Sequence, residues 1–258
     1  YTGGDSKGNL TGLRDKRVGV IGTGATAVQC VPFVGESAEH LYVFQRTPSS
    51  IDERGNRPTD PEWVASLESG WQQERIDNFG ILVSGGFQDV DLVSDGWTDI
   101  IRNLSGMAER GGLGTSPEEI AAQVETADFE KMEQIRSRVE AVVHDSATAE
   151  SLKPFYRQFC KRPCFNDEYL ATFNRTNVTL VDTQGRGVER IVRNGVVADG
   201  TEYELDCLIY ASGFEVGTDY TGRAGCEIVG RGGQTLTAKW RESVSTFQGV
   251  ASRGFPNC

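Results

Sequence analysis

Residues 18–27, Val18-Gly-Val-Ile-Gly22-Thr-Gly24-Ala-Thr-Ala27, place a short apolar segment directly before a glycine-rich turn. The apolar segment predicts a buried strand, and a helix is predicted from the turn to about Val34. A second strand is predicted at Leu41-Tyr-Val-Phe44, so that residues 17–46 form a βαβ unit. This order predicts an α/β fold with a parallel sheet and a Rossmann-like dinucleotide-binding domain.

The small residues of the turn suit a dinucleotide. Gly22 permits the tight turn, Gly24 lets a pyrophosphate approach the backbone, and Ala27 allows the helix to pack closely on the strand. The start of the helix supplies free N–H groups and the positive end of a dipole to the phosphates. An incidental glycine turn is the alternative, and it is disfavoured because strand, spacing and helix all agree.

The residues after the second strand favour NADP(H) over NAD(H). An NAD site usually places Asp or Glu about 20 residues past the glycines, where it accepts from the ribose 2′-OH. Here Gln45-Arg46-Thr47 follow the strand. Arg46 can form a charge-assisted contact with a 2′-phosphate, and Thr47 can add a hydroxyl. Such a contact is worth about 1.5–3 kcal/mol, roughly a tenfold to hundredfold preference. A solvated surface arginine is the alternative.

A helical region and a return to strands are predicted downstream. Ser116-Pro117-Glu118-Glu119 combines an N-cap serine, a proline at the first helical position and a capping-box glutamate. Apolar residues spaced by three and four then predict the buried face of a helix, formed by Phe129, Met132, Ile135, Val139 and Val142. Strands are predicted at 177–181 and 205–210, with hairpin turns at Asn194-Gly195 and Asp199-Gly200.

The composition excludes several classes of function. Lys and Arg number 26 against 37 Asp and Glu, and this net charge of -11 disfavours a nucleic-acid binder. No apolar run approaches the ~20 residues that span a bilayer, and no signal peptide is recognised, so we expect a soluble, cytoplasmic protein without a membrane partner. No metal site is expected, because the cysteines form no C-x-x-C pair and only two histidines are present. The cysteines are Cys30, Cys160, Cys164, Cys207, Cys226 and Cys258, and the histidines are His40 and His144.

Three motifs together resemble the Baeyer–Villiger monooxygenases, a class of FAD- and NADPH-dependent flavoproteins. Residues 22–29 followed by Val43-Phe-Gln-Arg-Thr-Pro48 are similar to the family's second nucleotide-binding motif. Lys161-Arg162-Pro163, with Tyr169 and residues 173–182 behind it, looks like the family's active-site segment. Residues 206–214 look like its D-x-x-x-x-A-T-G-F motif, with Ser212 in place of threonine. The resemblance covers nearly the whole chain.

The resemblance implies an activity and a site. In such an enzyme NADPH reduces FAD, and a flavin peroxide formed with O₂ inserts one oxygen atom next to a ketone carbonyl to give an ester or lactone. Arg46, Thr47 and Lys161 would hold the 2′-phosphate, and Arg162 would be the mobile active-site arginine that stabilises peroxide and anionic adduct. Further cofactor-binding residues implied by the motifs are Gly22, Thr23, Gly24, Ala25, Thr26, Ala27, Gln29, Ala211, Ser212, Gly213 and Phe214.

The resemblance also implies a domain plan. Residues 1–50 and 159–213 would form the NADP-binding domain, residues 51–158 a helical insertion, and residues 214–258 the start of the C-terminal part of an FAD domain. A strand–G-x-G-x-x-G–helix for FAD and the F-x-G-x-x-x-H-x-x-x-W fingerprint are expected before Tyr1. Both ends look cut, so this chain alone is expected to be inactive without the missing FAD-domain segments.

Other functions stay open. An N- or S-oxidising flavin monooxygenase shares the nucleotide-binding layout but should lack the Lys-Arg-Pro segment. A disulfide reductase is disfavoured because no redox cysteine pair occurs. A non-catalytic NADP-binding module is the third alternative, and Arg162 argues against it. Within the family, the helical insertion and residues 85–93 look closest to the branch that acts on large cyclic or steroid-like ketones.

Overall fold

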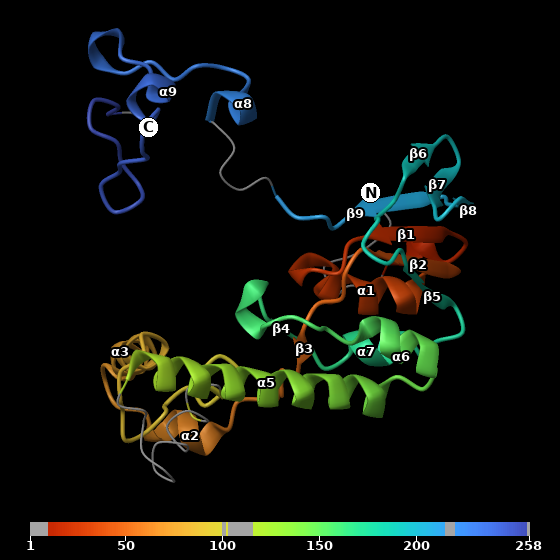
Figure 1. Ribbon diagram of the computed structural model, residues 1–258, viewed down its shortest axis with the longest axis horizontal. Coiled ribbons are helices and arrows are strands. Elements are labelled where there is room, and N and C mark those ends of the chain that lie inside the picture. Colours follow the sequence, from red (N-terminus) through yellow and green to blue (C-terminus); the bar gives the residue numbers. More distant parts are fainter. Residues whose placement is uncertain (1–9, 100–101, 103–115, 215–219, 257–258) are drawn as a thin grey trace. The chain divides into compact units, whose positions relative to one another are not determined.

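A computed structural model describes residues 10–99, 102, 116–214 and 220–256 (Figure 1). The chain divides into two compact units, Tyr1–Gly213 and Phe214–Cys258, and each is described by itself. Residues 1–9 of the predicted NADP-binding domain, most of residues 100–115 of the predicted insertion, and Cys258 lie outside the described residues. The predicted division of the first unit into an NADP-binding domain and an insertion stays a prediction.

A four-stranded parallel sheet forms the centre of the first unit. Its order is β5-β2-β1-β9, and its strands are β1 (Arg17–Ile21), β2 (His40–Gln45), β5 (Val178–Asp182) and β9 (Cys207–Tyr210). Val20 of β1 lies beside Val43 and Ile209, which extends the apolar layer across three strands. The predicted α/β class with a parallel sheet is therefore confirmed.

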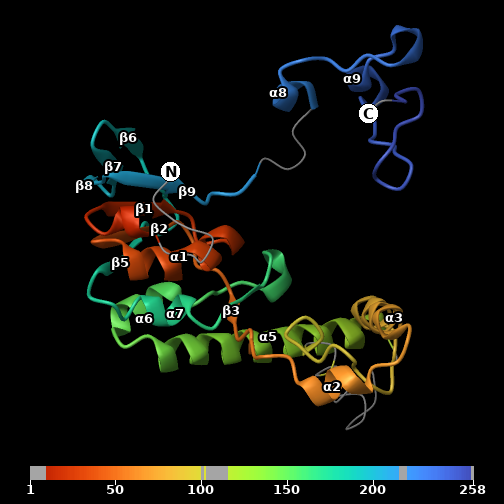
Figure 2. The ribbon, with the colours of Figure 1, turned by 180° about the vertical axis from the view of Figure 1, so that it is seen from behind.

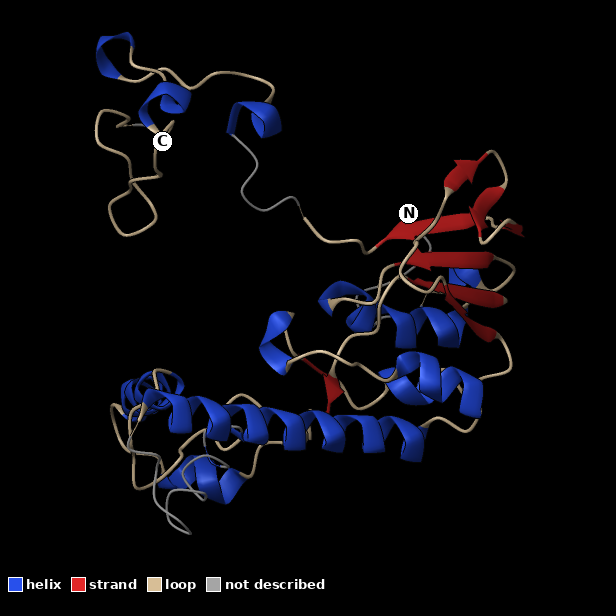
Figure 3. Cartoon of the chain, in the orientation of Figure 1, coloured by secondary structure: helices blue, strands red, loops and turns tan. Residues whose placement is uncertain are grey.

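Helix α1 (Ala25–Ser37) joins β1 to β2 and packs on the sheet (Figure 3). Val28, Val31 and Val34 are buried on the inner side of α1, in one cluster with Val18 and Leu41 of the strands. The short helix α7 (Tyr169–Thr172) adds Tyr169 and Leu170 to the same core. Burial of aliphatic side chains contributes about 1.5–3 kcal/mol each, so this layer fixes the position of the helix start.

A second cluster joins the parallel sheet to a three-stranded antiparallel sheet. This sheet consists of β6 (Arg190–Val192), β7 (Gly195–Ala198) and β8 (Thr201–Glu204). Val196 and Ala198 pack with Phe44 and Val181, and the ring of Tyr203 meets Phe44 edge-on with 5.3 Å between centroids. Asp199 and Gly200 have φ of 52° and 71°, as the predicted turn requires.

The predicted turn at Asn194-Gly195 is shifted by one residue. Val192 pairs with Gly195, so Arg193 and Asn194 are the central turn residues and Gly195 opens β7. A Cβ at Gly195 would lie 1.9 Å from the carbonyl oxygen of Tyr203. Glycine is therefore required there by the close approach of β8, which the local sequence does not reveal.

Helices predominate between residues 51 and 158 (Figure 2). They are α2 (Pro61–Ser66), α3 (Trp71–Val83), α5 (Pro117–Val142) and α6 (Ser146–Leu152). Helix α5 begins with the predicted capping box, in which the N–H of Glu119 donates to Oγ of Ser116 at 3.2 Å. Met132, Ile135 and Val139 are buried as predicted.

The prediction for Phe129 is wrong. Its side chain is 65% exposed, and its ring lies 5.8 Å from the guanidinium of Arg136. Short segments that periodicity did not predict are also present. They are β3 (Ile51–Asp52), which pairs in parallel with β4 (Cys164–Phe165), and the 3₁₀ turns η1 (Thr11–Leu13) and η2 (Gln158–Cys160).

The second unit is small. It contains α8 (Tyr220–Ala224), the turn η3 (Arg231–Gly233) and α9 (Leu236–Lys239). Leu236 and Phe255 are its buried apolar side chains, at 1% and 3% exposure. Its assignment to an FAD domain stays a prediction. Among the described residues, none of the helices has the length and apolar character needed to cross a membrane.

Candidate functional site

The glycine-rich turn lies between the ends of β1, β2 and β9. Gly22 has a φ of 108°, and its N–H donates to the carbonyl oxygen of Phe44 at 3.0 Å. A Cβ at Gly22 would lie 2.5 Å from the carbonyl oxygen of Ala211, which follows β9. Only glycine satisfies both the backbone conformation and this close contact.

The start of α1 is open. Gly24 is the N-cap residue with no side-chain cap, and a Cβ placed on it would meet nothing within 4 Å. Ala27 is fully buried against the sheet, whereas Ala25 is exposed. Thr23 is buried, and its Oγ1 donates to the carbonyl oxygen of Thr47 at 2.7 Å, which ties the turn to the end of β2. Uncapped N–H groups beside open space are what a phosphate group needs.

The three residues predicted for the 2′-phosphate come together. Nζ of Lys161 donates to Oγ1 of Thr47 at 2.5 Å and lies 4.5 Å from the centroid of the Tyr156 ring. Partial burial, and then the positive charge of Arg46, lower the pKa of Lys161. In the described part of the chain neither Arg46 nor Lys161 forms an ion pair. Two neighbouring cations without a carboxylate favour binding of an anion.

Arg162 lines a hollow of about 300 Å³ beside the start of α1. Its guanidinium lies 5.9 Å from the centroid of the Trp97 ring, and it too forms no ion pair among the described residues. The lining residues are Ala25, Val28, Gln29, Arg54, Trp97, Arg162, Pro163, Cys164 and Phe165. This hollow lies between the start of α1 and the predicted active-site segment.

Sequence reasoning missed Arg54 and Trp97. The loop that carries Arg54 is held by Asp167, whose carboxylate accepts from the N–H groups of Arg54, Gly55 and Asn56 at 2.8, 3.1 and 3.2 Å. These contacts join residues more than 110 positions apart, so no local pattern could have placed Arg54 in the hollow.

The segment after β9 reaches the glycine-rich turn only in part. The N–H of Ala211 donates to the carbonyl oxygen of Ile21 at 2.9 Å, and Ala211 is buried. Ser212 is exposed, and Gly213 has a φ of 92° with nothing within 4 Å of an added Cβ. Phe214, the first residue of the second unit, is 92% exposed.

Asp206 does not join the candidate site, because it precedes β9 at the opposite end of the sheet. It accepts from the backbone N–H of Arg17 at 2.8 Å and from Nε of Arg17 at 3.2 Å. These hydrogen bonds lower the pKa of Asp206 to about 2. In this structure Asp206 ties the start of β9 to β1.

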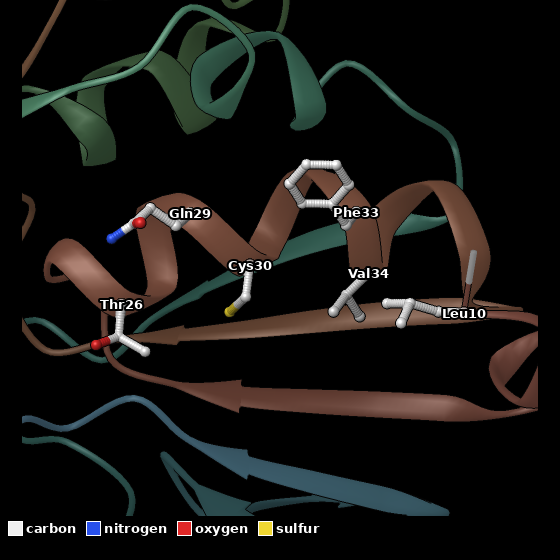
Figure 4. Close-up of a pocket in the computed structure, with 6 residues that line it drawn as sticks. All are labelled: Leu10, Thr26, Gln29, Cys30, Phe33 and Val34. Atoms are coloured by element: carbon white, nitrogen blue, oxygen red, sulfur yellow. The ribbon is translucent and has the colours of Figure 1, made fainter. Parts of the chain in front are cut away.

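A second hollow lies along another side of α1 and has a volume of about 460 Å³ (Figure 4). Its lining contains no charged side chain and consists of Leu10, Thr26, Gln29, Cys30, Phe33 and Val34. Thr26 therefore lines this largely apolar hollow and not the one beside Arg162, whereas Gln29 lines both. Within the described residues no group of His, Cys, Asp or Glu is arranged to hold a metal ion.

Curated proteins similar to this chain include a Baeyer–Villiger monooxygenase. No protein-family model matches the chain. It is 60% identical over 260 residues to neopentalenolactone D synthase of Streptomyces avermitilis, and 56% identical over 258 residues to a Baeyer–Villiger monooxygenase of Stachybotrys chlorohalonatus. These matches cover 100% of this chain, and 44% and 41% of the relatives. The chain is a relative of the Baeyer–Villiger monooxygenases.

Solved structures agree with this relationship. The polycyclic ketone monooxygenase from Thermothelomyces thermophila is 42% identical, with a TM-score of 0.81 over 99% of this chain and 43% of that one. A steroid monooxygenase bound to NADP is 30% identical, with a TM-score of 0.66 over 94% of this chain and 47% of that one. The chain thus spans less than half the length of these relatives and solved structures.

Proposed function

We propose that the protein containing this chain is an NADPH- and FAD-dependent monooxygenase that inserts one oxygen atom of O₂ next to a ketone carbonyl, giving an ester or a lactone. The observation that carries the proposal is the hollow that joins the start of α1 to Arg162. A nucleotide bound at the glycine-rich turn can therefore extend towards a permanently charged guanidinium.

The residues present fit NADPH. The open space at Gly24 accommodates a pyrophosphate against the backbone, and the uncapped start of α1 offers N–H donors. Arg46, Thr47 and Lys161 offer two positive charges and a hydroxyl to a 2′-phosphate. Binding of that phosphate would offset the burial and the charge of Arg46, which together lower the pKa of Lys161, and this supports a preference for NADP over NAD.

Solved neighbours and the motif at residues 206–214 support FAD as the second cofactor. Two solved neighbours are described as complexes of OTEMO with FAD and NADP. When bound, FAD supplies the redox chemistry with O₂ that no amino-acid side chain provides. We assign Ala211, Ser212, Gly213 and Phe214 to cofactor binding, because residues 206–214 resemble the family's motif.

The role of Arg162 follows from its charge. Attack on a ketone carbonyl places negative charge on the carbonyl oxygen, and a donor held near that oxygen stabilises the transition state. A guanidinium stays protonated and offers five N–H donors, so it can hold this charge without losing a proton. Arg162 is available for this task because no carboxylate pairs with it in the part of the chain described here.

We further propose a large cyclic or steroid-like ketone as the substrate. The aromatic side chains of Trp97 and Phe165 line the hollow beside Arg162 and suit an apolar ring system. Relatives named for polycyclic ketones and steroids support this class. A cytoplasmic location belongs to the same proposal and rests on the sequence alone.

The test uses the full-length protein loaded with FAD and compares Arg162→Ala with Arg162→Lys. We expect Arg162→Ala to lower the rate of ester formation by about 10²–10³-fold, because one donor to the developing oxyanion is lost. The Kd of NADPH should change by less than about twofold, since the phosphate residues are untouched. Arg162→Lys should retain part of the activity, because one charged donor remains.

Arg157→Ala is the matched control, because Arg157 is exposed and pairs with Glu125. Arg157→Ala should leave the rate of ester formation and the Kd of NADPH unchanged. An unchanged ester yield in Arg162→Ala would reject the proposal. A protein that oxidises amines or sulfides but no ketone would support the N- or S-oxidising alternative, and NADPH binding without any oxidation would support the non-catalytic module.

A further inference from the structure

The segment from Asp95 to Asp99 belongs to the helical region, yet it contacts the active-site segment. Trp97 presents its ring to the guanidinium of Arg162, with 5.9 Å from the guanidinium carbon to the ring centroid. The backbone N–H of Trp97 donates to Oδ1 of Asp95 at 2.9 Å, and Thr98 is fully buried. The backbone on both sides of Trp97 is therefore held in place.

Phe165 also packs against Trp97. The two ring centroids are 5.3 Å apart, with 53° between the ring planes. A Cβ at Gly96 would lie 2.1 Å from Cε1 of Phe165, so glycine is needed for the segment to approach the ring. Phe165 lies in β4, only three residues after Arg162. Trp97 thus packs against the same short stretch of chain whose arginine it faces.

A buried lysine links the segment that carries Trp97 to strand β3. Lys131 of α5 is 6% exposed, and its Nζ lies 2.6 Å from Oδ2 of Asp52 and 2.6 Å from Oδ2 of Asp99. Asp52 is the register partner of Phe165 in the β3–β4 pair. The ammonium group therefore links the segment that carries Trp97 to the strand pair that follows Arg162. A buried ammonium with two carboxylate partners resists rearrangement, since movement of Lys131 away from both carboxylates would leave its charge uncompensated in the interior.

We propose that Trp97 is a positioning residue that holds the guanidinium of Arg162 at the hollow beside α1, and that the Asp52–Lys131–Asp99 contacts hold Trp97 in turn. A guanidinium on a long, unpaired side chain samples many rotamers, and an aromatic face narrows that distribution. The inference rests on the proposed function only for its effect on ester formation. The position of Arg162 can be measured without any turnover.

The experiment compares Trp97→Leu and Trp97→Phe in the full-length protein. The probe is phenylglyoxal, which modifies arginine side chains, and mass spectrometry of peptides gives a separate rate for Arg162 and for Arg46. Loss of the aromatic face in Trp97→Leu should raise the rate at Arg162 about two- to fivefold, which corresponds to an exposed cation–π contact. Trp97→Phe should keep most of the protection, and the rate at Arg46 should stay constant.

A second variant tests the same inference without changing Trp97. Asp99→Asn weakens one of the two carboxylate contacts of Lys131 and should raise the rate at Arg162 by a smaller factor. The control is Trp63→Leu, because Trp63 is 40% exposed and packs on Trp71. It should change neither rate. Equal rates at Arg162 in the wild type, Trp97→Leu and Asp99→Asn would overturn the proposal, and so would a rise at both arginines, since that indicates general loosening.

Ester formation separates this inference from the proposed function. If Trp97→Leu raises the rate of modification at Arg162 and lowers the rate of ester formation with an unchanged Kd for NADPH, both are supported. If modification changes but Arg162→Ala forms ester normally, Trp97 positions an arginine that ester formation does not need. The proposed function then fails while the positioning role stands.

Discussion

The two ends of the parallel sheet differ in whether their positively charged side chains are paired with carboxylates. At the amino ends of β1 and β9, Arg17 is paired with Asp206 at 3.2 Å and with Glu204 at 2.5 Å. At the carboxyl ends, Arg46 and Lys161 lie together, and neither forms an ion pair in the described part of the chain. The chain has a net charge of -11, so carboxylates outnumber cations. The absence of a carboxylate partner for Arg46 and Lys161 among the described residues is therefore notable.

The pKa values reflect the same contrast. Hydrogen bonds from Arg17 lower the pKa of Asp206 to about 2, so both partners of that pair are stabilised in their charged forms. At the other end, burial and the charge of Arg46 lower the pKa of Lys161, which destabilises its charged form. Paired cations hold strands together, whereas unpaired cations that repel one another favour an anionic ligand.

The largest expected effect concerns the turn that forms the carboxyl end. Gly22→Ala should destabilise the protein by about 3 kcal/mol, because the new Cβ meets the carbonyl oxygen of Ala211 at a positive φ. Gly24→Ala should leave thermal unfolding nearly unchanged, since its Cβ has open space, but should weaken NADP binding. Thermal unfolding and calorimetric titration measure the two quantities. If Gly24→Ala binds NADP as well as the wild type, the pyrophosphate does not lie at that residue.

The next effect tests the unpaired cations directly. Arg46→Ala should weaken NADPH binding roughly tenfold to hundredfold while NADH binding changes little, because only NADPH carries the 2′-phosphate. Titration of the full-length protein with each nucleotide gives both Kd values. Arg14→Ala, outside the site, is the control. Equal losses for the two nucleotides would remove the 2′-phosphate from Arg46.

The lowered pKa of Lys161 predicts how the affinity for NADP depends on pH. Its folded-state pKa lies below the 10.5 of free lysine, so the ammonium loses its proton in the fold at a lower pH than in the unfolded chain. Stability should therefore rise as pH increases through that lowered pKa, whereas affinity for NADP should fall there as the ammonium is lost. Kd measured from about pH 7 to about pH 10 tests this, with the phosphate dianionic throughout. Lys161→Arg should remove the dependence, because arginine stays charged.

The sequence predicted features that depend on neighbouring residues. The βαβ order, the capping box at Ser116 and the glycine turn at Gly22 are local, because strand, helix and turn preferences act over a few positions. Phe129 was misplaced because periodicity identifies a face of a helix but not where the covering layer ends. The place of Arg46 directly after β2 could also be predicted from the local pattern, whereas its role in binding a phosphate stays a prediction.

Other parts of the site depend on contacts between distant segments. Trp97 faces Arg162 across 65 positions of sequence, and Arg54 is fixed by Asp167. Neither pair lies in a periodic pattern or a motif, so only the fold brings them together. The pairing of Arg17 with Asp206 likewise appears only when β1 and β9 are aligned.

The smallest expected effect belongs to that paired end. The pKa of Asp206 is about 2 in the fold and about 4 in an unfolded chain, so its contribution to stability is present above pH 4 and is lost as pH falls towards 2. Asp206→Asn should lower the thermal midpoint by a few degrees at neutral pH and flatten its acid dependence, because an exposed pair contributes little. Glu125→Gln is the control, since Glu125 of α5 forms an exposed ion pair with Arg157. If the thermal midpoint and its acid dependence are unchanged in Asp206→Asn, the Arg17–Asp206 pair does not stabilise the contact between β1 and β9. The contrast in stability between the two ends of the sheet would then be wrong.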